Sequence, residues 1–272
     1  MLALLTTVSF VGCVAVGMTF ITLSGNAMSF SLGATLSSTT LVFVAMQPAG
    51  LVPAILAAFA FSAAVCAAQG WVIGCFGASP IIVSMAALAL IDGFATLVTG
   101  GHAAYPTTNV ADVLMHPIGV APIPLVVFAS LAVCGQLVLA RTRFGRNVYM
   151  VGSNRQAACA AGIEPLRTVT FAYGAAGLCT AASAILIAAR YSSGDMEFGA
   201  GYDYQAISAV LVGGNAINGG QGSVLRTVGG TLLIAVVEAL LLLRGFSTPM
   251  QYLLIGVIVL FAIMLQYRGG AR

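Results

Sequence analysis

The chain has 272 residues, of which 60% are hydrophobic and only 6% are charged. Because soluble domains carry about 25% charged residues, this composition excludes a cytosolic globular protein. The mean hydropathy is +1.05, and the apolar runs are longer than a buried core helix needs. The sequence therefore predicts an all-α polytopic membrane protein.

The basic residues exclude several kinds of chemistry. All ten are arginine and the chain has no lysine, so it cannot supply the lysine of a P-loop, a Schiff base or a kinase site. Any nucleotide hydrolysis is therefore expected on another polypeptide. The six cysteines form no C-x-x-C pair and are expected to be ordinary packing residues.

Polar breaks divide the chain into about nine predicted crossings, with eight or ten as alternatives, including broken or re-entrant segments. The predicted ranges are 2–23, 30–47, 51–75, 81–100, 118–140, 168–190, 206–222, 224–243 and 249–267. Five glycines interrupt the range 206–222, so a half-helix or re-entrant segment is the alternative there. Gly70 and Gly74 have GxxxG spacing and are predicted to be helix-packing residues.

The first polar break, LSGNAMSFSLG, lies between the first two ranges and contains Asn26, Ser29 and Ser31. It is either a tight break inside the membrane or a turn at its surface, and periodicity does not decide between them.

Few ionisable residues lie within the predicted spans. Asp92 and Glu238 are isolated acids; an intramembrane charge usually marks function, but two acids without basic partners do not make a proton relay. His102, Asp112 and His116 are loop residues, and loop histidines beside prolines are more often solvated than metal-bound, so no metal site is expected. No pattern for an intramembrane hydrolase is present.

Arginine placement predicts the orientation of the chain. Residues 141–167 hold five of the ten arginines and one acid, Glu164, so the positive-inside rule places this segment in the cytoplasm. The C-terminal tail is expected inside as well, and the acidic segments 101–117 and 191–205 outside. Nine crossings would then place the N-terminus outside, so we expect a further helix to precede the first.

Within the arginine-rich segment, residues 154–162 predict a short helix of small side chains that ends at Gly162. Such a helix allows the backbone of a partner to approach closely, and the flanking arginines can meet the partner's acids. The alternative is a basic loop that only sets the topology.

Residues 209–230, AVLVGGNAINGGQGSVLRTVGG, combine paired glycines with several amide side chains. Exposed backbone at membrane depth is tolerated only where protein or a water-filled cavity surrounds it. The segment therefore predicts a packed hinge near a transport path. A nucleotide loop is disfavoured, because no lysine follows and no strand precedes it.

Four segments together resemble the membrane-spanning subunits of bacterial ABC importers of the ribose and branched-chain amino acid permease superfamily, most closely its sugar branch. They are AVGMTFITLSGNAMSFSLGA, PIIVSMAALALIDGFATLVTGG, FGRNVYMVGSNRQAACAAGI and GAGYDYQAISAVLVGGNAINGGQGSVLRTVGG. The resemblance runs from about Val11 to the C-terminus. It implies one transmembrane permease domain over residues 1–272 in the bacterial inner membrane, with a cytoplasmic coupling loop at 141–167.

The resemblance also implies a function: import of a small polar solute, a monosaccharide, driven by ATP hydrolysis on a separate subunit. This chain would then have no catalytic residue and no cofactor, since ATP and Mg would bind the partner ATPase. The expected partners are a second permease subunit, cytoplasmic ATP-binding subunits, a periplasmic solute-binding protein and the lipid bilayer, but not nucleic acid. The alternative is a stand-alone secondary transporter or channel with broken helices, which needs a coupling-ion site and no ATPase.

Three groups of residues follow from the resemblance. The ATPase-coupling group is Arg146, Asn147, Asn154, Gln156, Ala157, Ala158 and Gly162. The glycine-rich translocation or hinge element is Gly213, Gly214, Asn215, Gly219, Gly220, Gly222 and Ser223. The candidates for the solute path are Asn26, Ser29, Ser31 and Asp92, where the chain departs from the common family pattern.

Overall fold

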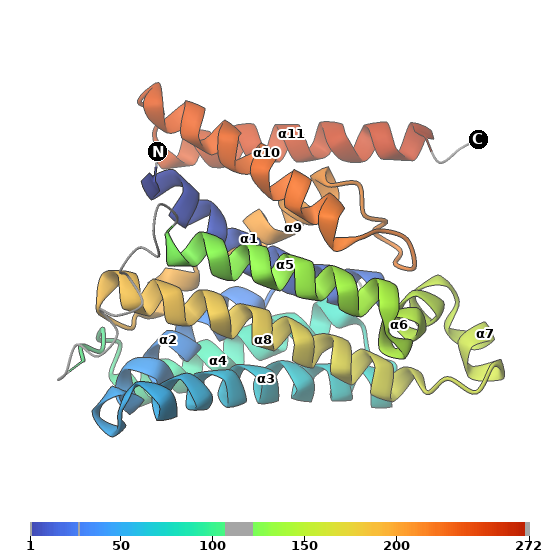
Figure 1. Ribbon diagram of the computed structural model, residues 1–272, viewed down its shortest axis with the longest axis horizontal. Coiled ribbons are helices and arrows are strands. Elements are labelled where there is room, and N and C mark those ends of the chain that lie inside the picture. Colours follow the sequence, from blue (N-terminus) through green and yellow to red (C-terminus); the bar gives the residue numbers. More distant parts are fainter. Residues whose placement is uncertain (1, 27, 107–121, 270–272) are drawn as a thin grey trace.

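The computed structural model describes residues 2–26, 28–106 and 122–269 (Figure 1). Within this part of the chain it contains helices and no named strand. The elements are α1 (Leu2–Leu23), α2 (Leu32–Met46), η1 (Gln47–Ala49), α3 (Leu51–Phe76), α4 (Pro80–Thr99), α5 (Ile123–Arg141), α6 (Arg143–Ser153), α7 (Arg155–Ala160), α8 (Pro165–Tyr191), η3 (Met196–Gly199), α9 (Tyr202–Val212), α10 (Val224–Leu243) and α11 (Thr248–Gly269). The all-α prediction is confirmed.

The long helices run roughly side by side, with α6 and α7 at one end of the bundle, which we call the hairpin end (Figure 1). Among the described residues, six helices are long and apolar enough to cross a membrane: α1, α3, α4, α5, α8 and α10. Together with α2, α9 and α11, they occupy the nine predicted ranges.

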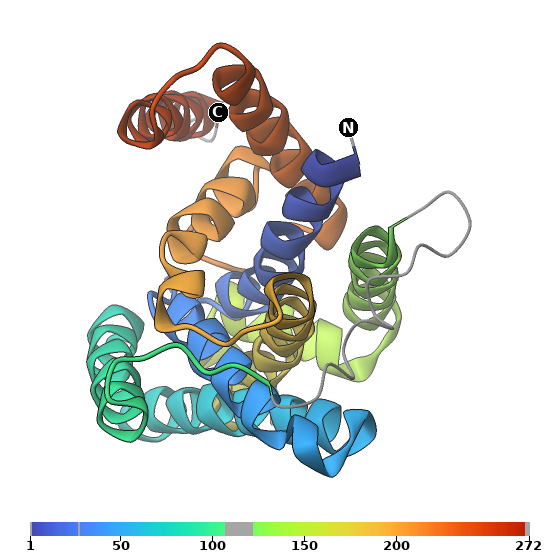
Figure 2. The same cartoon turned by 90° about the vertical axis from the view of Figure 1, so that its left-hand side faces the viewer.

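Burial separates central helices from peripheral ones. In the most apolar window of each helix, 83% of the residues of α1 and 78% of those of α8 are buried, against 11–28% in α3, α4, α5 and α10. Figure 2, which views the bundle from the end opposite the hairpin, shows α1, α2 and α8 surrounded by the other helices. Exposed apolar side chains on the outer helices suit lipid contact, as a membrane protein requires.

Small residues allow the central helices to pack closely. A Cβ atom on Gly70 of α3 would lie 2.8 Å from the Cβ of Tyr173 on α8, and one on Gly74 would lie 2.8 Å from Leu166. These contacts leave no room for a larger residue, which confirms the predicted packing role of Gly70 and Gly74.

Two helices of the bundle are too short to cross a membrane. α2 has 15 residues and α9 has 11, about 22 Å and 16 Å long at 1.5 Å per residue, whereas the hydrocarbon core is about 30 Å thick. The predicted crossings at 30–47 and 206–222 are therefore wrong as full spans, and the half-helix alternative for 206–222 is confirmed. The helix ends at Val212 because the glycines that follow adopt turn conformations, including Gly214 at a φ of 85°.

The break before α2 lies inside the bundle. Asn26, Ser29 and Ser31 are all buried, and the Ser31 hydroxyl donates to Oε1 of Gln69 on α3 at 2.6 Å. Because Gln69 lies seven residues before the end of α3, this contact is about 10 Å inside the bundle. Of the two predicted alternatives, the intramembrane break is the one observed.

Candidate functional site

The hairpin formed by α6 and α7 protrudes from the end of the bundle (Figure 1). In α7, the Asn154 side chain caps the helix by accepting a hydrogen bond from the Ala157 nitrogen at 3.0 Å. At the other end, Gly162 has a φ of 78°, and the Ile163 nitrogen donates to the Ala158 carbonyl at 3.0 Å, as in a Schellman turn. The predicted short helix and its end at Gly162 are confirmed.

The outer face of α7 carries small side chains. Ala157, Ala160 and Ala161 are exposed, whereas Ala158 is buried and joins the hydrophobic core. The Arg155 guanidinium donates to the carbonyl of Gly74 at 3.0 Å, which holds α7 against the last turn of α3. This face of α7 therefore carries short side chains close to the backbone, while the helix itself is fixed to the bundle.

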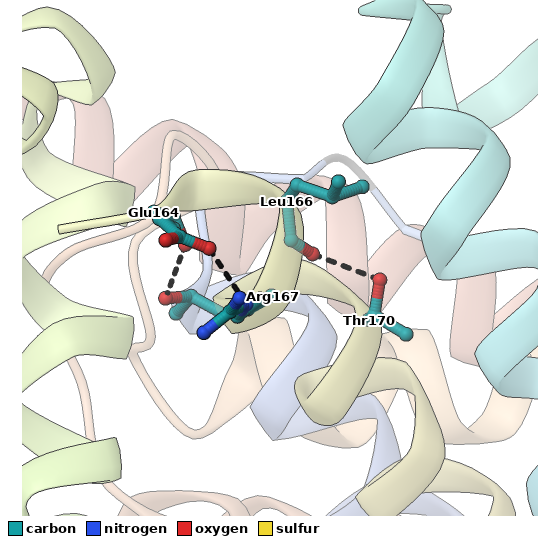
Figure 3. A network of polar contacts seen from close by, with 5 residues as sticks. Glu164, Leu166, Arg167 and Thr170 are labelled. Carbon is teal, nitrogen blue, oxygen red and sulfur yellow. Dashed lines mark hydrogen bonds and ion pairs between the residues drawn. The ribbon is translucent and has the colours of Figure 1, made fainter.

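An ion pair closes the hairpin where α8 begins. Figure 3 shows Glu164 and Arg167 facing each other across the first turn of α8, with Nε of Arg167 2.7 Å from Oε2 of Glu164. Both side chains are more than half exposed, so the pair contributes about 1 kcal/mol or less to stability. Because Glu164 is the one acid in residues 141–167, the hairpin surface remains strongly positive.

Three backbone segments cross where the hairpin meets the bundle. They are the end of α1 near Gly25, the end of α6 at Gly152 and the loop between α9 and α10 at Gly219 and Gly220. The Gly220 nitrogen donates to the Leu23 carbonyl at 3.1 Å. A Cβ on Gly152 or Gly219 would collide with backbone atoms of the neighbouring segments, so only glycine permits this crossing.

A side-chain contact also links the hairpin to the glycine-rich loop. The Tyr149 hydroxyl, on α6, donates to the Gly222 carbonyl at 2.9 Å. Burial raises the pKa of the Tyr149 phenol above its ordinary value, against a smaller lowering by Arg226, so the hydroxyl keeps the proton that it donates. The hairpin that carries the coupling residues therefore contacts the glycine-rich loop directly, through Tyr149 and Gly152 of α6, which are not among the predicted coupling residues.

Asn215 holds the glycine-rich loop in shape. Its side chain is fully buried. Its Nδ2 atom donates to the Val210 carbonyl at 3.1 Å and to the Thr227 hydroxyl at 2.8 Å, while Oδ1 accepts from the Ser223 nitrogen at 2.8 Å. The Thr227 hydroxyl lies 2.6 Å from that of Thr19 on α1. One amide thus joins the loop to α9, α10 and, through Thr227, α1.

The starts of the two short helices are joined inside the bundle. Oδ1 of Asp203, in the first turn of α9, accepts from the Gly33 nitrogen in the first turn of α2 at 2.8 Å. The Ser37 hydroxyl donates to the Met196 carbonyl and accepts from the Gly199 nitrogen, both at 2.8 Å. The predicted loop 191–205 is wrong in its extent, because α9 begins at Tyr202 and Asp203 lies buried in its first turn, where the carboxylate accepts a hydrogen bond from the backbone of α2.

The candidates for the solute path do not form one surface. Asn26, Ser29 and Ser31 are buried against neighbouring chain, whereas Asp92 lines a cavity between α2, α4, η3 and α9 that none of the other three lines. Glu238 is the other isolated acid, and its Oε1 atom accepts a hydrogen bond from Nε2 of Gln205 at 2.8 Å. Among the loop residues considered for a metal, Asp112 and His116 lie outside the described residues.

Sequence reasoning missed two features of the site. The first is α6, a helix of 11 residues that was not predicted, although the spacing of Phe144, Val148 and Val151 is helical. The second is the link between Asp203 and Gly33, which joins residues 170 positions apart and has no local signal.

Comparisons with known proteins agree with this architecture. A family model described as "Branched-chain amino acid transport system / permease component" matches residues 1–263. The chain is 29% identical to the ribose import permease protein RbsC of Bacillus subtilis over 99% of this chain and 85% of that protein. It is 30% identical to the L-arabinose transport system permease protein AraH of Escherichia coli over 75% of this chain and 63% of that protein.

A third relative is the autoinducer 2 import system permease protein LsrD of Yersinia enterocolitica, with 27% identity over 93% of this chain and 79% of that protein. No solved structure matches the chain. The family model covers almost the whole chain, these three relatives transport sugars or autoinducer 2, and the bundle is built of long apolar helices and two short ones. The chain is therefore a multi-pass membrane permease that belongs to the branched-chain amino acid transport system permease family, in its sugar branch.

Proposed function

We propose that this chain is the membrane-spanning subunit of an ABC importer and works beside a second permease subunit. ATP-binding subunits dock on the hairpin from the cytoplasm and supply the ATP and Mg chemistry. A periplasmic binding protein delivers a small polar solute, a monosaccharide, to the opposite end. The names of the relatives, which import ribose, L-arabinose and autoinducer 2, support a solute of this class.

One observation carries the proposal: the hairpin touches the glycine-rich loop directly. Tyr149 binds Gly222, and the backbone of Gly152 packs against Gly25 and Gly220 without intervening side chains. Close-packed contacts transmit displacement because neither side can yield without moving the other. A partner that shifts α7 would therefore shift the loop between α9 and α10, and with it the half-helix α9.

The hairpin also offers a place for a partner to bind. A hollow of about 300 Å³ lies between α6 and α7 and is lined by Tyr149, Met150, Ser153 and Ala157, among others. A partner side chain that fills this hollow would contact Tyr149, which itself holds the glycine-rich loop. Docking and loop position would then be linked through one residue.

The test is uptake of radiolabelled D-ribose and L-arabinose by cells that express the chain with its native partners. An ABC importer loses uptake when arsenate depletes ATP and keeps it when a protonophore collapses the ion gradients. A secondary transporter shows the reverse pattern, and that result would overturn the proposal.

A matched pair of variants locates the coupling surface. Ala157→Arg places a large charged side chain in the hollow and should abolish uptake. Ser79→Arg places the same side chain on the exposed connection between α3 and α4 at the same end of the bundle, and should leave uptake near the wild-type level. Equal effects of the two variants would contradict docking at the hairpin.

A further inference from the structure

A cavity of about 570 Å³ opens beside the joint between the two short helices. It lies between α2, α4, η3 and α9, and its lining includes Phe30, Ser37, Met85, Asp92, Asp203 and Tyr204. Figure 2 shows α4 and α11 at the two edges of this side of the bundle, with α9 between them. The volume is that of a small-molecule site.

The acidic side chains on the wall of this cavity face no basic one. Asp92 and Asp203 both line it, and the lining contains no arginine. Asp92 belongs to α4, one of the six apolar helices long enough to span the membrane. Within the described part of the chain, no hydrogen bond or ion pair joins Asp92 to another residue; the one ion pair there is Glu164 with Arg167.

The two acids have different tasks. The Asp203 carboxylate is engaged by the Gly33 nitrogen, so its position is fixed by the start of α2. Asp92 has no such partner among the described residues, and an intramembrane acid almost always faces the bundle interior or a water-filled cavity. The cavity wall therefore presents one structural carboxylate and one that is available to a solute.

We propose that this cavity selects the solute by charge: it admits neutral and positively charged hydroxylated solutes and excludes anionic ones, such as sugar acids and sugar phosphates. Asp92 is the specificity-determining residue. A negative charge on Asp92 at the cavity wall repels anions, whereas solute hydroxyl or ammonium groups can donate hydrogen bonds to it. The inference rests on the proposed function, since it assumes that solute passes this cavity.

Cysteine labelling measures the charge selection without knowledge of the cargo. In a background with the exposed Cys75, Cys134 and Cys159 changed to serine, Met85→Cys places a reporter on the cavity wall. A second reporter, Val259→Cys, lies in a neighbouring cavity whose lining contains no acid. Each is reacted in native membranes with methanethiosulfonate reagents of similar size that carry a positive, a negative or no charge.

We expect the ratio of the positive-reagent rate to the negative-reagent rate to be about tenfold higher at position 85 than at position 259. Asp92→Asn should lower the ratio at position 85 at least threefold, and Asp92→Arg should bring it below the ratio at position 259. Unchanged labelling by the neutral reagent shows that each variant keeps the cavity intact. Equal ratios at the two reporters, no response to Asp92→Asn, or no reaction of Met85→Cys with the neutral reagent would each overturn the proposal. Labelling does not depend on ATPase binding, so its failure is distinct from failure of the proposed function.

Discussion

Gly219 stands at the backbone crossing where the hairpin, α1 and the glycine-rich loop meet, and Gly219→Ala tests that crossing. The residue has a φ of 82°, and an added Cβ would overlap the Cα of Gly25 and lie 2.6 Å from its nitrogen. Those atoms are backbone and cannot rotate away. The substitution must therefore displace either the loop or the end of α1.

The expected loss of stability has two parts. The left-handed conformation costs a residue with a Cβ about 1 kcal/mol, and forcing an atom into a packed region costs about 1–3 kcal/mol more. Gly219→Ala should therefore lower the free energy of unfolding by roughly 2–4 kcal/mol.

Gly77→Ala is the matched control. Gly77 has a φ of 61°, but no atom lies within 4 Å of the position its Cβ would take, so only the conformational cost of about 1 kcal/mol applies. Thermal unfolding of the two purified variants in the same detergent should show the larger decrease in Tm for Gly219→Ala, by about 2–4 °C for each further kcal/mol. Equal Tm values would refute the reasoning that backbone contact, rather than glycine conformation, defines this crossing.

Three further predictions concern single side chains. Asn215→Ala should lower the free energy of unfolding by roughly 2–4 kcal/mol, because it leaves buried hydrogen-bond partners unsatisfied. Asn218→Ala, at an exposed position, should change that free energy by about 0.5 kcal/mol or less. Chemical denaturation in detergent compares the two variants, and similar losses would contradict the role of the Asn215 hydrogen bonds. Asp203→Ala should lower the free energy of unfolding by roughly 1–3 kcal/mol. Asp203→Asn keeps an oxygen acceptor for the Gly33 nitrogen and should lower it less. The reverse order would contradict the contact between the starts of α2 and α9. Burial raises the folded-state pKa of Tyr149, so the unfolded chain loses the phenol proton first and the free energy of unfolding falls as pH rises above about 10. Tyr149→Phe should reduce this fall between about pH 9 and pH 11. An unchanged pH dependence of Tm would show that the half-buried phenol is not its source.

The sequence predicted the elements whose signals are local. Long apolar runs predicted the positions of α1, α3, α4, α5, α8 and α10 to within a few residues at most ends. The short helix α7 was predicted together with its boundary, because its asparagine cap and the glycine after it act within a single turn.

Local signals did not decide how deep the short elements lie. The composition of the segment before α2 fits a surface turn as well as an intramembrane break; its burial depends on α3, which supplies Gln69 as a partner for Ser31. In the same way, the sequence around Asp203 is typical of an acidic external loop, and only the structure shows that the Gly33 nitrogen of α2 donates a hydrogen bond to its carboxylate. Contacts between segments far apart in the chain decide both cases, and no local pattern encodes them.

The candidate site was predicted in parts rather than as a whole. The coupling and glycine-rich residues were predicted as two separate segments, and the structure joins the hairpin that carries the first to the second through Tyr149 and Gly152, which belong to neither group. Tyr149 lies on α6, the helix that was missed, and one tyrosine in a basic segment carries no pattern. Only its position beside Gly222 shows its role.

The central claim is that an ATP-hydrolysing partner docks on the hairpin. Affinity purification of the tagged chain from its native membrane, by gentle detergent extraction, tests it most directly. We predict that an ATPase subunit copurifies with the wild type and with Ser79→Arg, and that it is absent from equally folded Ala157→Arg. Intact wild-type protein that carries no ATPase, or an Ala157→Arg variant that retains it in full, would contradict the account.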